Sequence, residues 1–288
     1  MYPIFLLITS CLFFSILATI IKFNSNLIHP IEQAFFRNFI SIFILLPWLI
    51  NQKIVIPKKE NFKLLLLRGL FGGITMILLF LSYSLIPLSQ AMAISFSTPV
   101  FIYFGSIFFF KEEPKKNITI LMLIGFTLTL IIIRPDLNLE LGTIFALLAA
   151  ITHAITGLLV KRLSRTESIT TLMFSMVILM TPITFVPSLF FWTVPNSFDL
   201  LSTLLITAIV ATLGNYFWTK SISIGNLTNL MPFDFTKLIF ATTFGLFFFN
   251  EKIDYITINC GIGLIICNTL MAKINKNNDK VKRVFSDN

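Results

Sequence analysis

The sequence predicts an all-α integral membrane protein with ten transmembrane helices, arranged as two inverted five-helix repeats with both termini in the cytoplasm. Three observations predict this fold class. The chain is 56% hydrophobic and only 12% charged, whereas roughly 25% of the residues in soluble domains are charged. Its Lys and Arg residues gather in alternate loops, and the chain resembles itself after a shift of 139 positions.

Ten segments are long and apolar enough to span a membrane, which takes about 20 mainly apolar residues. We place them at residues 3–21, 31–50, 62–85, 88–110, 118–133, 139–160, 168–191, 199–222, 227–249 and 256–272. The N-terminus lacks a basic region and an obvious small-residue cleavage site, so we expect the first span to be retained rather than removed as a signal peptide.

The distribution of positive charge sets the topology, because cytoplasmic loops carry an excess of Lys and Arg. The loops and tail on the N-terminal side hold fifteen Lys and Arg, and the opposite side holds only Lys22, Arg134 and Lys252. This bias favours ten spans with cytoplasmic termini, although Lys22 directly after the first span points the other way. The net charge of +9 is explained by this topology and not by nucleic-acid binding, since the basic residues form no single basic face.

The internal repeat is clearest between residues 86–113 and 225–252. Over positions 82–112, ten of 31 residues are identical to the residue 139 positions later, including a shared FFF-x-E ending. Each copy contains five helices, an odd number, so the two copies cross the membrane in opposite directions. Inverted repeats of this kind are typical of secondary transporters, which bind substrate near the midplane between the repeats.

These counts divide the chain into three parts. We expect the first five-helix repeat at residues 1–137, the second at 138–273, and a basic polar cytoplasmic tail at 274–288. Such a tail is attracted to the anionic cytoplasmic leaflet, so membrane lipid is an expected partner.

Asp234 and Lys237 are the clearest candidates for a binding site, because an ionisable group inside a span costs about 2.5 to 3.5 kcal/mol on insertion scales. A separation of three residues on a helix lets them pair. The pair is either structural or opens to meet a charged substrate. The repeat places Ser95 and Thr98 at the equivalent positions, so one copy offers hydroxyls where the other offers charges, which favours a polar substrate.

Two prolines near the middle of repeat-related spans suggest a broken backbone beside a wet cavity. Pro99 and Pro232 cannot donate a backbone hydrogen bond, which frees the carbonyl groups of Ser95 and Thr228. We take both prolines as candidate helix-break or gating positions, with a simple packing kink as the alternative.

Five further residues have roles that the sequence leaves open. Arg37 is expected to face the bundle, either in a structural pair or in contact with substrate. We interpret Arg68 as a snorkelling residue near the cytoplasmic side and His153 as a packing residue. Among the aromatic residues, Tyr103 and Trp218 are candidates for substrate contact, because such rings hold cations and stack on bases.

The sequence contains no catalytic set. There is no G-x-S-x-G, H-E-x-x-H or Walker-type motif, and the three cysteines lie in apolar runs without metal-type spacing. We therefore expect no enzyme activity, no cofactor and no metal. Without an ATP site, transport would use substrate exchange or an ion gradient.

The motifs in the first half resemble a known family. A turn proline, Pro99 in the middle of the span and a glutamate closing it, together with EQAFFRNF at residues 32–39, resemble the EamA-type members of the drug/metabolite transporter superfamily. The second copy departs from the pattern, with Leu238 where the first has Pro99. Among subfamilies, the chain is most similar to the S-adenosylmethionine uptake transporters of obligate intracellular bacteria.

The resemblance implies a multi-pass transporter of the bacterial inner membrane that moves a small polar metabolite. Its most specific form is S-adenosylmethionine uptake, with exchange as one mode. An amino-acid or drug exporter of the same fold is the alternative, and a membrane enzyme or a non-transporting scaffold is the alternative of another class. The sequence leaves a monomer or a homodimer open.

Overall fold

A computed structural model describes residues 2–51, 57–95, 97–133, 140–249, 255–256, 259–263, 265–267, 269–271 and 273–274. All regular elements in these stretches are helices, as the composition predicts. The predicted repeat boundary at 137–138, Arg134, Lys252 and the tail from residue 275 lie outside the described residues.

The first half of the chain forms six α-helices and one short 3-10 turn. They are α1 (Tyr2–Asn24), α2 (Pro30–Asn51), η1 (Lys59–Asn61), α3 (Phe62–Leu85), α4 (Leu88–Ser95), α5 (Ser97–Phe110) and α6 (Lys116–Ile133). The second half follows with α7 (Leu141–Leu163), α8 (Ile169–Ser188), η2 (Leu189–Phe191), α9 (Phe198–Ile224), α10 (Leu227–Leu230), η3 (Met231–Phe235) and α11 (Thr236–Phe249). A shorter apolar helix covers Asn259–Met271.

The helix boundaries repeat with the same 139-residue shift as the sequence. Helices α1 and α7 each have 23 residues and begin at Tyr2 and Leu141. Helices α2 and α8 begin at Pro30 and Ile169, and α3 and α9 end at Leu85 and Ile224. The shift that aligns the residues therefore also aligns the ends of these helices.

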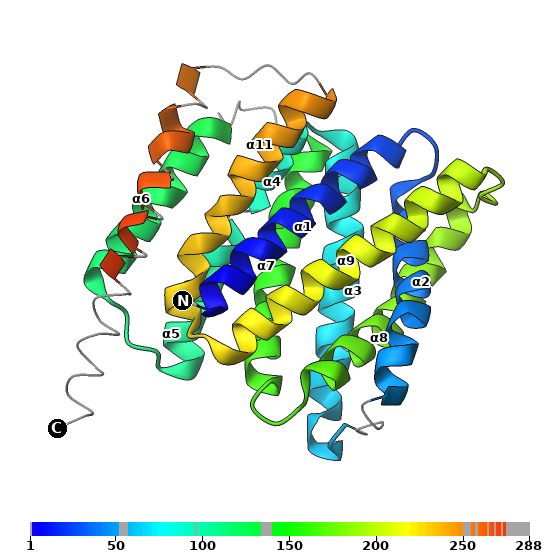
Figure 1. The fold of residues 1–288 in the computed structure, drawn as a ribbon, viewed down its shortest axis with the longest axis horizontal. Helices are drawn as coiled ribbons and strands as arrows, with labels where there is room; N and C mark the ends of the chain where they lie inside the picture. Colours follow the sequence, from blue (N-terminus) through cyan, green and yellow to red (C-terminus); the bar gives the residue numbers. More distant parts are fainter. Residues whose placement is uncertain are drawn as a thin grey trace.

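The packing partners are exchanged between the two halves. Helix α3 packs along α7, and α9, the counterpart of α3, packs along α1, the counterpart of α7. Figure 1 shows α1 and α9 running side by side across the front of the bundle, with α3 and α7 behind them. Helices α2 and α8, which are counterparts of each other, also pack together. Each half thus completes its core with helices from the other half.

Seven helices of the described chain are long and apolar enough to cross a membrane. They cover Tyr2–Asn24, Lys59–Leu85, Gln90–Phe110, Leu141–Leu163, Ile169–Phe191, Phe198–Ile224 and Leu227–Phe249. Two shorter apolar helices, Lys116–Leu128 and Asn259–Met271, coincide with the predicted fifth and tenth spans. Large apolar side chains such as Phe108 and Phe190 are exposed on the outside of the bundle, where a soluble protein would place polar groups.

The predicted ninth span is interrupted. It passes from α10 through the 3-10 turn η3 into α11, and Pro232 lies at the start of η3. In the predicted fourth span, α4 and α5 lie on either side of residue 96, which is outside the described residues, and Pro99 lies within α5. The η3 turn is buried, so the backbone departs from a regular α-helix inside the bundle.

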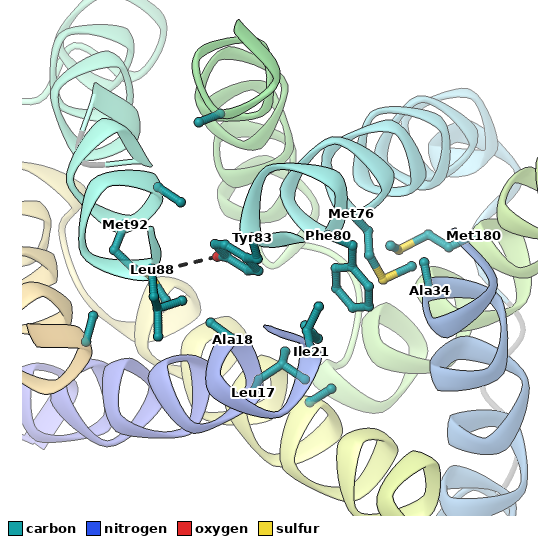
Figure 2. Close-up of a cluster of buried hydrophobic side chains, with 14 of the residues drawn as sticks. Leu17, Ala18, Ile21, Ala34, Met76, Phe80, Tyr83, Leu88, Met92 and Met180 are labelled. Carbon is teal, nitrogen blue, oxygen red and sulfur yellow. Dashed lines mark hydrogen bonds between the residues drawn. The ribbon is translucent and has the colours of Figure 1, made fainter. Parts of the chain in front are cut away.

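A buried apolar cluster packs α1, α3 and α4 against one another. Figure 2 shows Leu17, Ala18 and Ile21 of α1 facing Tyr83 of α3 and Leu88 of α4. The Tyr83 hydroxyl donates to the Met92 sulfur at 3.9 Å, which links α3 to α4. Next to this cluster the packing opens into a cavity.

Candidate functional site

The cavity lies between helices of both halves and holds about 1000 Å³ of empty space, counted to its open edge. Its wall is built from α1, α2, α3, α4 and α5 of the first half and from α7, α8, α9, η3 and α11 of the second. Its polar side chains are Arg37, Arg68, Thr75, Tyr83, Ser95, Thr98, His153, Thr156, Trp218, Asn215, Asp234 and Lys237. The wall combines these polar groups with apolar side chains such as Leu17, Leu79 and Phe80, a mixture typical of sites for small molecules.

Most of the residues that the sequence singled out meet at this cavity. Those in its wall are Arg37, Ser95, Thr98, Trp218, Asp234 and Lys237. Tyr103 is fully buried outside it and shares a hydrogen bond with the hydroxyl of Thr119 on α6. Pro99 and Pro232 are buried beside the wall and do not line it.

Asp234 and Lys237 form a buried ion pair. The Lys237 ammonium lies 2.6 Å from Oδ1 and 2.8 Å from Oδ2 of Asp234. The side chains of both residues are almost fully buried. Two residues of α1 contact this pair. The Cys11 thiol donates to Asp234 Oδ1 at 3.6 Å, and the centroid of the Phe14 ring lies 5.3 Å from the Lys237 ammonium.

The local backbone explains why these two charges meet. Pro232 lies at the start of η3, and Asp234 is in this 3-10 turn directly before α11 begins. Lys237 follows in the first turn of α11, so the spacing of three residues puts both groups on one face. The interruption thus carries a charge pair into the cavity wall.

The repeat-related hydroxyls also reach this wall but make different contacts. Thr98 donates to the backbone carbonyl of Ala150 on α7 at 3.1 Å. Ser95 donates to the carbonyl of Ala91 one turn earlier in its own helix. At these repeat-related positions, the first half contributes neutral hydroxyls and the second half contributes a charge pair.

The interpretation of Arg68 as a snorkelling residue was wrong. Its side chain is only 1% exposed and lines the cavity. The guanidinium turns toward α8, where one nitrogen donates to the carbonyl of Leu172 and another lies 3.7 Å from the Met176 sulfur. A position six residues into a span is compatible with either direction, and no sequence signal indicated the inward one.

Aromatic side chains form one side of the same space. His153 of α7 and Trp218 of α9 lie with their ring centroids 5.2 Å apart, at an angle of 37°. Both line the cavity, so His153 is a wall residue in contact with an aromatic ring. A flat aromatic ligand could stack in such surroundings, and a cation could lie over the Trp218 face.

The cavity wall contains three basic side chains, those of Arg37, Arg68 and Lys237, and one acidic side chain, that of Asp234. Within the described ranges, no three His, Cys, Asp or Glu residues lie close enough to hold a metal ion. The arrangement offers hydrogen bonding, charge pairing and ring stacking to a polar ligand.

Comparison with known proteins gives the family context. The sequence profile of the EamA-like transporter family matches residues 1–134 and again residues 140–273. The S-adenosylmethionine uptake transporter of Rickettsia conorii is 28% identical over 252 residues, covering 86% of this chain and 84% of that protein. The pseudopaline exporter CntI of Pseudomonas aeruginosa is 23% identical over 265 residues, covering 91% and 93%.

A solved crystal structure also resembles this chain. The TM-score is 0.78 at 14% sequence identity, covering 94% of this chain and 98% of the other. At this identity the likeness concerns the fold alone.

Proposed function

Because the chain belongs to the EamA-like transporter family, we propose that it is a secondary carrier of the bacterial inner membrane that moves a small polar metabolite by alternating access. The observation that carries this proposal is the cavity between the two halves, whose wall contains the buried Asp234–Lys237 pair. Buried charges inside a membrane domain are expensive and mark substrate or ion pathways. A non-transporting scaffold would have no need of such a cavity, and the family match favours transport over catalysis.

The proposed topology has ten spans with both termini in the cytoplasm. The seven long apolar helices and the two shorter ones account for nine of these spans, and α2, which has 22 residues, accounts for the remaining one. The excess of Lys and Arg in alternate loops gives the orientation. In this orientation the chain consists of two inverted repeats, at residues 1–137 and 138–273, followed by a cytoplasmic tail.

The exchanged packing supports alternating access. Because α3 packs on α7 and α9 packs on α1, the two halves form two similar interfaces, one on each side of the cavity. Rocking of one repeat against the other would loosen one interface while the other stays closed, which is how inverted-repeat carriers expose a fixed site to each side in turn.

We propose S-adenosylmethionine as the substrate, taken up alone or in exchange for its demethylated product. The Rickettsia relatives named for this activity suggest the substrate, and the cavity offers groups that fit its chemistry. Asp234 suits the ammonium group, Trp218 and His153 suit the adenine ring or the sulfonium, and Arg37 suits the carboxylate. Ser95 and Thr98 add hydroxyls on the opposite wall.

The second candidate is export of an amino acid or another polar metabolite by the same fold. The similarity to a pseudopaline exporter favours this candidate, and the cavity geometry is compatible with both uptake and export. In both cases we propose that membrane lipid surrounds the apolar outer surface and that the protein is a monomer or a homodimer.

Uptake of radiolabelled S-adenosylmethionine into bacterial cells expressing the protein tests the proposal. Wild type is expected to exceed empty vector, and Asp234→Asn and Lys237→Ala are expected to fall close to it. Glu113→Gln is a matched control, because Glu113 is exposed outside the helices. If correctly inserted wild type gave no uptake above vector, S-adenosylmethionine would be excluded. Full uptake by both variants would remove the site assignment alone.

A further inference from the structure

The charges in the cavity do not balance. Lys237 is neutralised by Asp234, which leaves two cavity-lining arginines, Arg37 and Arg68, and no further acidic side chain among the described residues of the wall. No described residue forms an ion pair with either guanidinium. An arginine cannot lose its charge in a protein, and a buried charge without a counter-charge is costly.

Arg68 has unused hydrogen-bond donors. Its contacts are the carbonyl oxygen of Leu172 and the sulfur of Met176, and its Nε has no partner. A thioether sulfur is a weak acceptor, whereas a guanidinium presents five N–H donors. This side chain is therefore almost fully buried and only partly satisfied.

Arg37 is in the same situation on a different helix. It is 3% exposed, donates to Asn38 Oδ1 at 2.7 Å and lies 3.3 Å from the Met76 sulfur. Its Nε also has no partner. Two independent helices, α2 and α3, thus each place a buried guanidinium with spare donors at one cavity.

The two arginines lie at different depths. Arg37 contacts Met76, which follows Arg68 by eight residues on α3, and at 1.5 Å per residue this separation is about 12 Å along the helix. In the proposed orientation α3 begins at the cytoplasmic side, so Arg68 marks the inner level of the cavity and Arg37 the outer level.

We propose that Arg37 and Arg68 bind the substrate carboxylate at the outer and the inner level of the cavity, so that the carrier accepts only metabolites that bear a carboxylate. A guanidinium fork fits a carboxylate in a bidentate pair, and the ligand would supply the missing negative charge. This inference rests on the proposed carrier function. It assigns to Arg68 a specificity-determining role in addition to the pair at Asp234.

The excess positive charge in the cavity also predicts an order of binding affinity among related ligands. S-adenosylmethionine carries a sulfonium that its demethylated product, S-adenosylhomocysteine, lacks. Both bear the carboxylate, so we expect both to bind, with S-adenosylhomocysteine at least as tight. Decarboxylated S-adenosylmethionine keeps the sulfonium, the adenine and the amine but lacks the carboxylate, and we expect its affinity to be lower by about tenfold or more.

The experiment measures binding of these three ligands to purified full-length protein in lipid nanodiscs. For wild type, the affinity ratio between S-adenosylmethionine and its decarboxylated analogue is expected to be large. In Arg68→Gln the ratio is expected to fall toward one, and Arg68→Lys, which keeps the charge without the fork, is expected to give an intermediate ratio. Arg162→Gln, at an exposed position of α7, should leave the ratio unchanged.

The ratio separates this role from a structural one, because a packing defect would weaken both ligands alike. An equal affinity of wild type for the decarboxylated analogue would overturn the inference. If Arg68→Gln does not fold, the affinity ratio of Arg68→Lys is used instead. An Arg68→Lys ratio equal to that of wild type would equally overturn the inference.

A second ligand set distinguishes this inference from the choice of substrate. The same protein is tested with L-glutamate, succinate and L-methionine, each beside its amide. If no adenosyl compound binds but a carboxylate binds more tightly than its amide, and Arg68→Gln removes that preference, the proposed substrate fails and the arginine assignment stands. If no carboxylate in either set binds, the assignment is wrong.

Discussion

The side-chain ammonium of Lys161 donates to the backbone carbonyl of Gly225, in the turn between α9 and α10. It donates also to the carbonyl of Ile222 at 3.1 Å. Its counterpart 139 positions earlier, Lys22, donates to the carbonyl of Ile86 at 3.2 Å, and Ile86 is the counterpart of Gly225. The repeat therefore preserves a contact in which a lysine near the end of α1 or α7 donates to the turn that precedes α4 or α10.

A second contact at each end uses the Phe-rich runs. The Lys22 ammonium lies 5.2 Å from the centroid of the Phe249 ring, and the Arg165 guanidinium lies 5.2 Å from that of Phe110. Phe249 and Phe110 are themselves 139 positions apart. At each end of the bundle, a basic residue of one half thus contacts the last aromatic residue of the Phe-rich run in the other half.

We predict that these lysines control which side of the cavity opens. Lys161→Gln and Lys22→Gln each shorten the side chain and remove a charged donor, so each should loosen one end and lower transport. In the proposed orientation, Lys161→Gln favours the state open to the cytoplasm and Lys22→Gln the state open to the outside. The accessibility of the cavity is measured with a single cysteine at Thr156, introduced into a protein without its native cysteines. An impermeant thiol reagent labels this cysteine only when the cavity is open to the side of the reagent.

The two variants should change labelling from the outside in opposite directions. Lys22→Gln is expected to raise it, and Lys161→Gln to lower it. Arg162→Gln serves as the control, because Arg162 neighbours Lys161 in sequence but is exposed. Parallel changes in both lysine variants would contradict separate roles for the two ends.

We also predict that Glu112 stabilises the start of the interrupted helix in the second half. Its carboxylate accepts from the backbone nitrogen of Leu227 at 3.2 Å and from that of Thr228 at 2.9 Å. Glu112→Ala should cost about 1 to 2 kcal/mol of stability, as loss of a capping carboxylate does. Glu113→Ala should cost little, since Glu113 is exposed. Thermal unfolding in detergent of both variants checks the difference.

Much of the architecture was predictable because its signals are long and repetitive. Runs of about 20 apolar residues predict membrane-spanning helices, and the matching FFF-x-E endings predict that the second half repeats the first. The contacts of Glu112 were not predictable in the same way, since its partners are backbone nitrogens of Leu227 and Thr228, more than a hundred positions away. Such a contact depends on how the two halves dock.

The candidate site was predictable only where the sequence breaks a rule of membrane helices. Asp234 and Lys237 stand out because they are charges in the middle of an apolar span. Arg68 lies near the end of its span, where an outward direction costs little, and only the packing of α3 on α8 turns it inward. Tyr103 shows the converse, because a polar ring in a span can find a partner, here Thr119, without reaching the cavity.

The close packing of α3 on α8 gives a further prediction. A Cβ atom added at Gly73 would lie 2.7 Å from Cγ2 and 3.1 Å from Cβ of Ile183, which is too close for either helix to keep its position. Gly73→Ala should therefore destabilise the protein by about 1 to 3 kcal/mol. At Gly261 nothing lies within 4 Å of the added atom among the described residues, and Gly261→Ala should be neutral or stabilising. The midpoint of thermal unfolding should fall for Gly73→Ala and should stay unchanged or rise for Gly261→Ala.

The last prediction concerns the Asp234–Lys237 pair and distinguishes a structural role from a role in substrate binding. Asp234→Asn leaves the Lys237 ammonium buried without its carboxylate, and loss of one partner of a buried pair costs about 3 to 5 kcal/mol. The double variant Asp234→Asn/Lys237→Met removes both charges, and replacement of a buried pair by uncharged groups of similar size is often neutral. Thermal unfolding should therefore show a destabilised single variant and a largely restored double variant.

Transport by the double variant decides the role of the pair. If Asp234 binds the substrate ammonium, the double variant regains stability but not transport, because the carboxylate is still absent. If the pair only fixes the packing of η3 against α1, where Cys11 and Phe14 contact it, transport should return together with stability. We expect the first result, because both charges line the cavity, and a purely structural pair would be as useful away from it.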